Sequence, residues 1–192
     1  MGLTLCAFGH VATTAELLAA VDGQESIVDI YQRSSFLVRP RRGVYACAHL
    51  RAVELAALRA GGVLDCVSAL CAAGAEVSDD GCLHVRFHAE GSRARPRPEL
   101  AGVPVTAHWS RVQTERRPAA ANLIAHRFHR PVLTRSRLPP QEALRQALVC
   151  VPPERLRTVI DAVTGSVLPF DEVRRIVSGA RRSVREQLMR VR

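Results

Sequence analysis

Lysine is absent from this 192-residue chain, so all 27 of its Lys and Arg positions are arginine. They outnumber the 18 acidic residues and leave a formal net charge of +9 at pH 7. The planar guanidinium of arginine forms paired hydrogen bonds with phosphates and with the edge of guanine. A strongly basic chain therefore predicts a polyanionic partner, either a nucleic acid or an anionic membrane surface.

Long hydrophobic runs are missing as well. No stretch of about 18 apolar residues occurs, and this excludes a membrane-spanning helix on the usual length criterion. The N-terminus lacks a charged start followed by an apolar block and a small-residue cleavage site, so we expect no secretory signal. We therefore expect a cytoplasmic protein with no membrane partner.

Recognisable metal and catalytic motifs are also lacking. The cysteines form no C-x-x-C pair, which argues against zinc and favours buried, reduced thiols. They are Cys6, Cys47, Cys66, Cys71, Cys82 and Cys150. No phosphate-binding Walker loop, no G-x-G-x-x-G and no Ser-His-Asp motif is found. We therefore expect no catalytic residue, no metal and no cofactor, and hence a protein that is not an enzyme.

Helix-start signals dominate the first part of the chain. Thr13 and Glu16 have the spacing of a capping box, with a hydroxyl at the cap and a carboxylate three residues later. Asp22 to Glu25 repeats this pattern and predicts a second capped helix. In that helix Ile27, Ile30 and Tyr31 recur at helical spacing and are expected to face the core.

A basic hairpin follows these helices, over Phe36 to Ala46. Two short strands flank Gly43, which supplies the backbone freedom that a tight turn needs. The arginines Arg39, Arg41 and Arg42 crowd the tip, where their mutual repulsion is relieved by a bound anion. Two helices followed by a basic hairpin are typical of a winged helix-turn-helix. Residues 1–50 are therefore expected to form a DNA-binding domain.

The remainder, residues 51–192, reads as a second domain. Helices are predicted over 51–60 and 65–73, strands over 82–88, 103–109 and 123–128, and further helices from Pro140 onward. The expected fold class is α+β: an N-terminal winged helix-turn-helix, then a mixed α/β domain with basic strands and loops that ends in helices.

Arginine is concentrated between Arg86 and Arg135, which suggests a second DNA surface. His84, Arg86 and His88 share one face of the 82–88 strand, and an exposed basic loop is expected over 91–98. Metal binding by the two histidines is an alternative, but the sequence shows no third ligand near them. The competing interpretation of this charge is a merely solvated surface.

The residues expected to contact DNA thus come from the second helix, the hairpin and the central basic region. They are Gln24, Glu25, Ser26, Asp29, Gln32, Arg33, Arg39, Arg41, Arg42, His84, Arg86, His88, Arg93, Arg95 and Arg97.

The block that runs from Val11–Leu18 through Phe36–Ala46 resembles the N-terminal winged helix of AbiEi-type antitoxins of type IV toxin–antitoxin systems. The most specific element is Arg41-Arg42-Gly43-Val44-Tyr45. Weaker similarity continues over 59–64, 83–85, 102–106 and from Leu156 onward. The restriction-endonuclease-like domain that many relatives carry is expected to be missing.

The resemblance implies a sequence-specific transcriptional repressor that binds operator DNA in its own promoter and has a cognate toxin as a second partner. A phage-type repressor has the same features. The alternative function is a protein-binding antitoxin or adaptor whose second domain engages a toxin or another protein. A nuclease fragment without its catalytic domain is a third interpretation.

Overall fold

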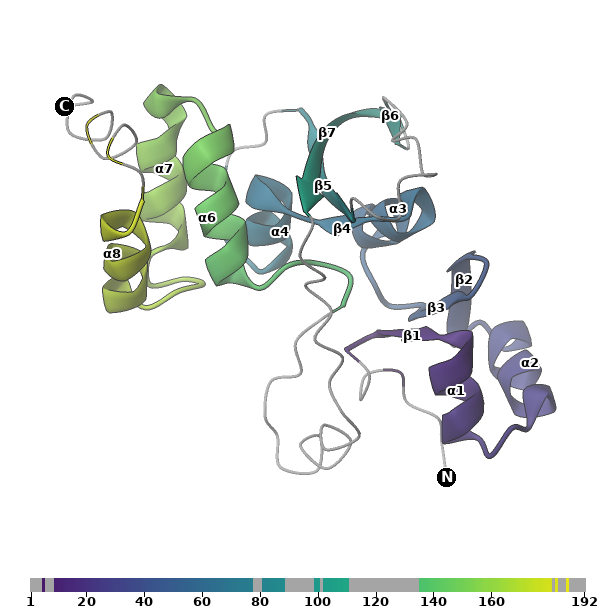
Figure 1. Cartoon of the computed structure of the whole chain (residues 1–192). Helices are drawn as coiled ribbons and strands as arrows, with labels where there is room; N and C mark the ends of the chain where they lie inside the picture. The colour runs from purple at the N-terminus through teal and green to yellow at the C-terminus, as the bar shows by residue number, and fades with distance from the viewer. Residues whose placement is uncertain are drawn as a thin grey trace.

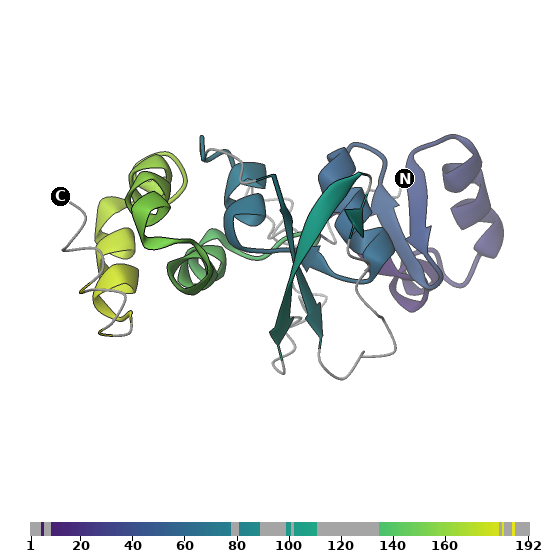
Figure 2. The ribbon, with the colours of Figure 1, turned by 90° about the horizontal axis from the view of Figure 1, so that it is seen from above.

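The structure is a computed structural model that describes residues 5, 9–77, 81–88, 99–100, 102–110, 135–180, 182 and 186, with backbone alone at 88, 99, 100 and 110. Over these residues the fold is mixed α+β, and this much of the expected fold class is confirmed. The N-terminal elements lie at one end and the C-terminal helices at the other, with a second sheet between them (Figures 1 and 2).

The first unit, residues 9–50, is called the N-terminal module below. It contains β1 (Val11–Thr13), α1 (Thr14–Ala20), α2 (Glu25–Arg33), β2 (Leu37–Arg41) and β3 (Val44–Cys47). Its strands form an antiparallel sheet in the order β1-β3-β2. Leu17, Val28, Leu37 and Tyr45 belong to its core.

The capping box at the start of α1 is confirmed. The Glu16 N–H donates to Thr13 Oγ1 at 3.3 Å, and the Thr13 N–H donates to Glu16 Oε2 at 2.8 Å. These bonds satisfy two donors that have no partner within the helix.

The second predicted capping box, at Asp22, is wrong. Helix α2 begins at Glu25 behind Gln24, which makes no side-chain cap hydrogen bond. Asp22 instead has φ +50° and Gly23 has φ +77°, because the chain reverses between the two helices at these residues. Asp22 therefore lies in the turn, too early to cap α2.

The buried stripe of α2 also differs from the expectation. Val28 is its buried residue, and Ile27 and Tyr31 are partly buried against the same core. Ile30 is 63% exposed, so the prediction that it faces the core is wrong. A helical stripe centred on Val28 places Ile30 on the opposite side, about 200° around the axis.

The predicted hairpin is present as β2 and β3, with Arg41 opposite Val44 and Arg42-Gly43 as the connecting residues. Gly43 has φ +79°, a conformation that costs a glycine little. The pairing register shifts between Val38 and Arg41. Pro40 lies in this interval, and its missing N–H explains why the ladder is interrupted there.

Helix α3 (Ala52–Ala60) leads into the second sheet, which contains β4 (Val63–Leu64), β5 (Leu83–His88), β6 (Glu99–Leu100) and β7 (Val103–Ser110). The strand order is β4-β5-β7-β6; β5 and β7 pair in parallel, whereas β4 with β5 and β6 with β7 pair antiparallel. Helix α4 (Cys66–Ala72) follows β4 in the chain and contacts β5.

Three further helices complete the described chain: α6 (Pro140–Cys150), α7 (Pro153–Val163) and α8 (Phe170–Ser178). Helix α6 packs on α4, and α7 and α8 pack on α6. Each of these helices buries an apolar stripe, which includes Leu144 on α6, Val159 on α7 and Ile176 on α8. The predicted strand at 123–128 lies outside the described residues.

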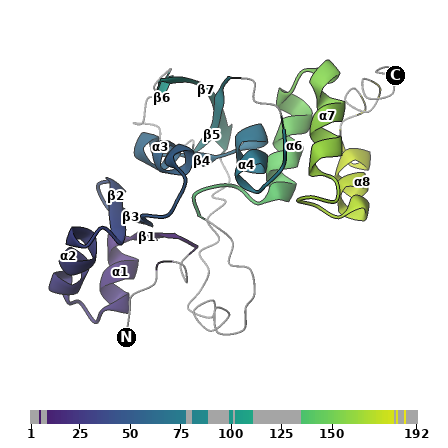
Figure 3. The ribbon, with the colours of Figure 1, turned by 180° about the vertical axis from the view of Figure 1, so that it is seen from behind.

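The described residues from 51 onward are called the second unit below. Its Arg135–Leu138 segment contacts the N-terminal module (Figure 3). The Arg135 N–H donates to the Gly9 carbonyl oxygen at 2.8 Å. The Leu64 N–H donates to the Ser136 carbonyl oxygen at 3.0 Å, and the Leu138 N–H donates to the Leu64 carbonyl oxygen at 2.9 Å. The Ser136 hydroxyl donates to the buried Glu54 carboxylate at 2.6 Å, and Arg137 contacts the same carboxylate at 3.3 Å. One short segment therefore contacts elements from both units.

Candidate nucleic-acid interface and a buried histidine–cysteine cluster

The expected DNA-contacting side chains of the N-terminal module are all exposed. On α2 and the residue before it they are Gln24, Glu25, Ser26, Asp29, Gln32 and Arg33, and on the hairpin they are Arg39, Arg41 and Arg42. Helix α2 contacts β2, so both sets belong to one compact unit.

The hairpin arginines differ in how they are held. The Arg39 guanidinium carbon lies 5.6 Å from the centre of the Tyr45 ring, a cation–π contact that orients the side chain. Within the described part of the chain, no ion pair joins Arg41 or Arg42 to an acidic side chain. The tip of the hairpin is therefore a concentrated positive charge that an anion would stabilise.

Ile30 is a surface residue that the sequence reasoning missed. It lies four residues after Ser26 and three before Arg33, so the three side chains share one helix face. The sequence shows the helical spacing of Ile30 with these two polar residues, but the prediction placed Ile30 in the core because its side chain is hydrophobic.

The central basic region is placed differently from the expectation. His84 is 2% exposed, so it does not lie on an exposed face of the strand. Arg86 is also directed inward: its Nε donates to Asp65 Oδ2 at 2.9 Å and its Nη2 to Gln146 Oε1 at 3.2 Å. Both faces of β5 are covered, since Val85 and Phe87 are buried on one face and His84 on the other. Gln146 of α6 contacts Arg86 and His108 at this second face.

The side chain of His88, and Arg93, Arg95 and Arg97 in the predicted 91–98 loop, lie outside the described residues.

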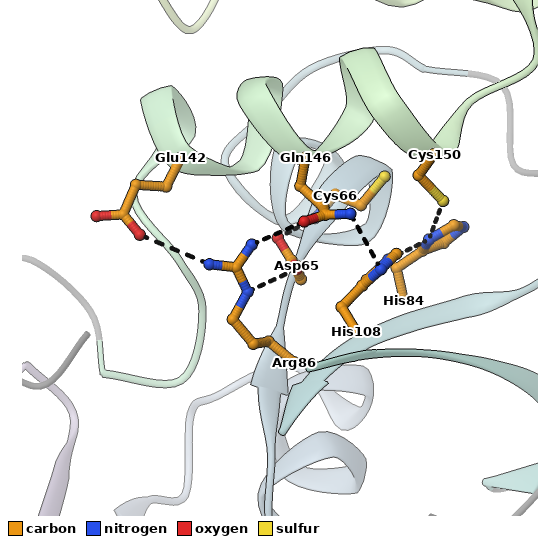
Figure 4. Close-up of polar contacts among 8 residues, drawn as sticks. All are labelled: Asp65, Cys66, His84, Arg86, His108, Glu142, Gln146 and Cys150. Carbon is orange, nitrogen blue, oxygen red and sulfur yellow. Dashed lines mark hydrogen bonds and ion pairs between the residues drawn. The ribbon is translucent and has the colours of Figure 1, made fainter. Parts of the chain in front are cut away.

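His84 is instead part of a buried cluster with His108, Cys66 and Cys150, in which one ligand atom from each residue lies within 4.8 Å of the others (Figure 4). His84 Nδ1 and His108 Nε2 are 3.1 Å apart, and Cys150 Sγ lies 3.7 Å from His84 Nδ1. His84 lies on β5 and His108 on β7, while Cys66 lies on α4 and Cys150 on α6.

Local contacts position each member of this cluster. Cys66 is the first residue of α4, and its N–H donates to the Asp65 side chain at 2.6 Å. The His84 N–H donates to Ser68 Oγ at 2.9 Å. The parallel pairing of β5 with β7 places Thr106 opposite His84, so that His108 lies two residues further along. Gln146 Nε2 contacts His108 Nδ1 at 3.2 Å.

Burial dominates the electrostatics. It lowers the pKa of His108 to about 4, aided by the nearby His84 and Arg86, so this imidazole is neutral near pH 7. Burial, with Cys150 close by, raises the pKa of the Cys66 thiol. Burial likewise raises the pKa of Asp65, against the opposing effect of its partner Arg86.

Sequence spacing gave no sign of this cluster. Its members are separated by whole secondary-structure elements, and the strand pairing that joins His84 to His108 is not local. The sequence predicts buried, reduced thiols for the cysteines but does not indicate that two of them lie beside histidines. Among the described ones, Cys47 and Cys66 are buried, Cys71, Cys82 and Cys150 are partly exposed, and none forms a disulfide.

A second, smaller group contains His10, Cys47 and His49 in the N-terminal module. His49 Nε2 and His10 Nδ1 are 3.0 Å apart, and His49 is exposed.

None of the helices in the described ranges has the length and apolar character needed to cross a membrane. No protein-family model matches the chain. No curated protein matches it either. Among solved structures, it is similar to the crystal structure of the RV2827C protein from Mycobacterium tuberculosis, at 19% sequence identity and a TM-score of 0.37. That match covers 95% of this chain and 71% of the other.

Proposed function

We propose that the chain is a sequence-specific DNA-binding transcriptional regulator that acts through its N-terminal module. The observation that carries the proposal is the exposed polar face of α2 beside a hairpin whose tip holds Arg41, at the end of β2, and Arg42, in the turn. The element order β1, α1, α2, β2, β3 and the sheet order β1-β3-β2 support a winged helix-turn-helix, with β2 and β3 as the wing.

In this proposal α2 is the recognition helix and enters the major groove. Gln24 and Gln32 are suited to adenine, Arg33 to guanine, and the carboxylates of Glu25 and Asp29 to the amino group of cytosine. The exposed Ile30 adds an apolar group able to contact a thymine methyl.

The wing has a different role in the proposal. Arg41 and Arg42 contact backbone phosphates, which position the module without reading the sequence. The repulsion between these two guanidinium groups, which lie next to each other in the chain, is relieved when phosphates take up their charge.

The operator is proposed to lie in the protein's own promoter, where binding would repress transcription. This part follows from the resemblance of Val11 to Leu18 and Phe36 to Ala46 to AbiEi-type antitoxins.

The test measures the dissociation constant of the full chain for labelled duplex DNA taken from upstream of its own reading frame, and for a shuffled duplex of equal length. Arg41→Ala/Arg42→Ala is expected to weaken binding by roughly tenfold or more at low salt, because two phosphate contacts are lost. The matched control, Arg145→Ala/Arg174→Ala, removes the same charge from exposed positions on α6 and α8.

The control is expected to bind DNA within about twofold of the wild type, since exposed substitutions distant from a site change little. Both variants should retain the wild-type melting temperature. Equal binding by the wing variant and the wild type would contradict the wing assignment. Equal affinity for the promoter and shuffled duplexes would contradict sequence-specific regulation.

A further inference from the structure

We propose that Cys66, Cys150, His84 and His108 bind one Zn²⁺ ion in the interior of the second unit, at a structural site. The proposal is independent of DNA binding.

The donor set and its geometry both suit zinc. Two thiolates and two imidazoles are among the common ligand sets of structural Zn²⁺, which binds sulfur at about 2.3 Å and nitrogen at about 2.0–2.1 Å in a tetrahedron. Those bond lengths place the two nitrogens about 3.3 Å apart and a nitrogen about 3.6 Å from a sulfur. The structure has 3.1 Å between His84 Nδ1 and His108 Nε2, and 3.7 Å between His84 Nδ1 and Cys150 Sγ.

The remaining ligand needs only a small movement. All four ligand atoms already lie within 4.8 Å of one another, whereas two sulfurs on one zinc ion are about 3.8 Å apart. Because 4.8 Å is the upper limit for every pair, an inward shift of about 1 Å at most brings the two sulfurs to that separation, a displacement within reach of a side-chain rotation.

Charge balance explains why such a site is tolerated in the interior. Two thiolates neutralise the double charge of the ion, and the thiol protons pass to solvent on binding. Cys66 is 0% exposed, His84 2% and His108 8%, so a charged or half-filled site would carry a large desolvation cost here. Four protein ligands leave no coordination position for a substrate, and this favours a structural over a catalytic role.

The surrounding polar groups can orient the ligands. Coordination through His108 Nε2 leaves the proton of that ring on Nδ1, so the Gln146 amide turns its oxygen toward His108 to accept it. Arg86 gives up its bond to Gln146 Oε1 in that arrangement and keeps its 2.9 Å contact with Asp65.

The ion would link elements that are far apart in the chain. Cys66 on α4 and His84 on β5 precede residues 111–134, and Cys150 on α6 follows them. Zinc would therefore fasten α6 to the sheet, adding a bond at the place where α4, β5, β7 and α6 meet (Figure 4).

The experiment purifies the untagged full chain under reducing conditions, without chelators, loads it with Zn²⁺, removes excess metal and measures zinc per chain. Co²⁺ is then bound in place of zinc, because its absorption spectrum reports tetrahedral geometry and thiolate ligation. The wild type is expected to hold one ion per chain and to give the spectrum of a tetrahedral site with two thiolates.

Variants locate the site. Cys66→Ser/Cys150→Ser is expected to lose at least about tenfold in zinc affinity. The control Cys71→Ser/Cys82→Ser removes two cysteines outside the cluster and is expected to keep the ion. His49→Ala, which removes a ligand from the smaller group, is expected to keep it as well.

The double serine variant could lose zinc simply because it unfolds. Cys150→His serves as a second test, because it replaces one ligand with another and so preserves the number of ligands. It is expected to retain one Co²⁺ with a weaker thiolate-to-metal absorption band, since one sulfur has been replaced. The proposal is overturned if the reduced wild type takes up no zinc, if His49→Ala abolishes uptake, or if the Co²⁺ spectrum of the wild type lacks thiolate bands.

Discussion

Arg135 and Glu16, which are 119 positions apart in the chain, form an ion pair in which Arg135 Nη1 lies 3.0 Å from both carboxylate oxygens. The same nitrogen donates to the Val11 carbonyl oxygen at 3.2 Å, and Glu16 also completes the capping box of α1. The pair therefore joins the start of α1 to the segment that precedes α6. Arg135 belongs to the region that the sequence predicted to be a second DNA surface, but its side chain binds Glu16 and Val11 within the protein.

We expect Arg135→Ala to lower the free energy of unfolding by about 1–3 kcal/mol, the range for hydrogen bonds to a charged group. The side chain is 12% exposed, so solvent screens the pair only in part. Chemical denaturation of the variant beside Arg145→Ala, an exposed arginine on α6, measures the difference. Equal stability of the two variants would show that the pair contributes nothing.

The same pair predicts a pH dependence. Burial raises the pKa of Glu16, but the Thr13 N–H and Arg135 together outweigh it and hold the pKa below the ordinary value of 4.5. A carboxylate with a lowered pKa stabilises the fold above its unfolded-state pKa and loses that contribution as the pH falls through the folded-state value. We expect the stability difference between wild type and Glu16→Gln to be constant above pH 4.5 and to shrink below it. A difference independent of pH across this range would contradict the assignment.

The close packing around Gly62 leaves no room for a larger side chain. A Cβ at this position would lie 2.5 Å from Val85 Cγ1 and 2.6 Å from the Arg86 carbonyl oxygen, which belongs to the backbone of β5 and cannot easily move. We expect Gly62→Ala to destabilise the fold by about 1–3 kcal/mol, as overpacking does elsewhere. Gly179→Ala is the control, because the nearest atom to its Cβ would be 3.4 Å away. Thermal unfolding of both variants provides the comparison.

The proposed phosphate contacts predict a salt dependence. Each phosphate neutralised adds about 0.9 to the magnitude of the slope of log affinity against log salt concentration. We expect Arg41→Ala/Arg42→Ala to reduce that magnitude by about 2, measured by anisotropy over a salt series. If the variant had a lower affinity but the same slope as the wild type, these arginines would not act by contacting phosphates.

The proposed recognition helix predicts altered base preference. Gln32→Ala and Ile30→Ala on α2 should change the ranking of operator variants, since each removes a group suited to one base. The Arg41→Ala/Arg42→Ala variant should weaken binding and leave the ranking unchanged. Selection from a random DNA pool with each protein measures this, and an unchanged ranking for both α2 variants would place base recognition elsewhere.

Local signals were sufficient for much of the fold. The capping box at Thr13, the hairpin around Gly43 and the alternation of Leu83, Val85 and Phe87 each depend on residues a few positions apart, and the structure contains all three features. The two errors have different causes: Asp22 lies in the turn before α2, and the buried stripe of α2 is centred on Val28, which places Ile30 on the opposite side.

The sequence by itself determined the basic charge, the lack of lysine, the positions of several helices and of strands β5 and β7, and the arginine-rich turn, because these depend on composition and short-range spacing. Only the tertiary structure decided that Arg86 and Arg135 are paired internally and that His84 is buried. It also brought Cys66, His84, His108 and Cys150 together, through the parallel pairing of β5 with β7 and the packing of α6 on α4. Contacts between residues so far apart depend on how whole elements pack, which no short stretch of sequence specifies.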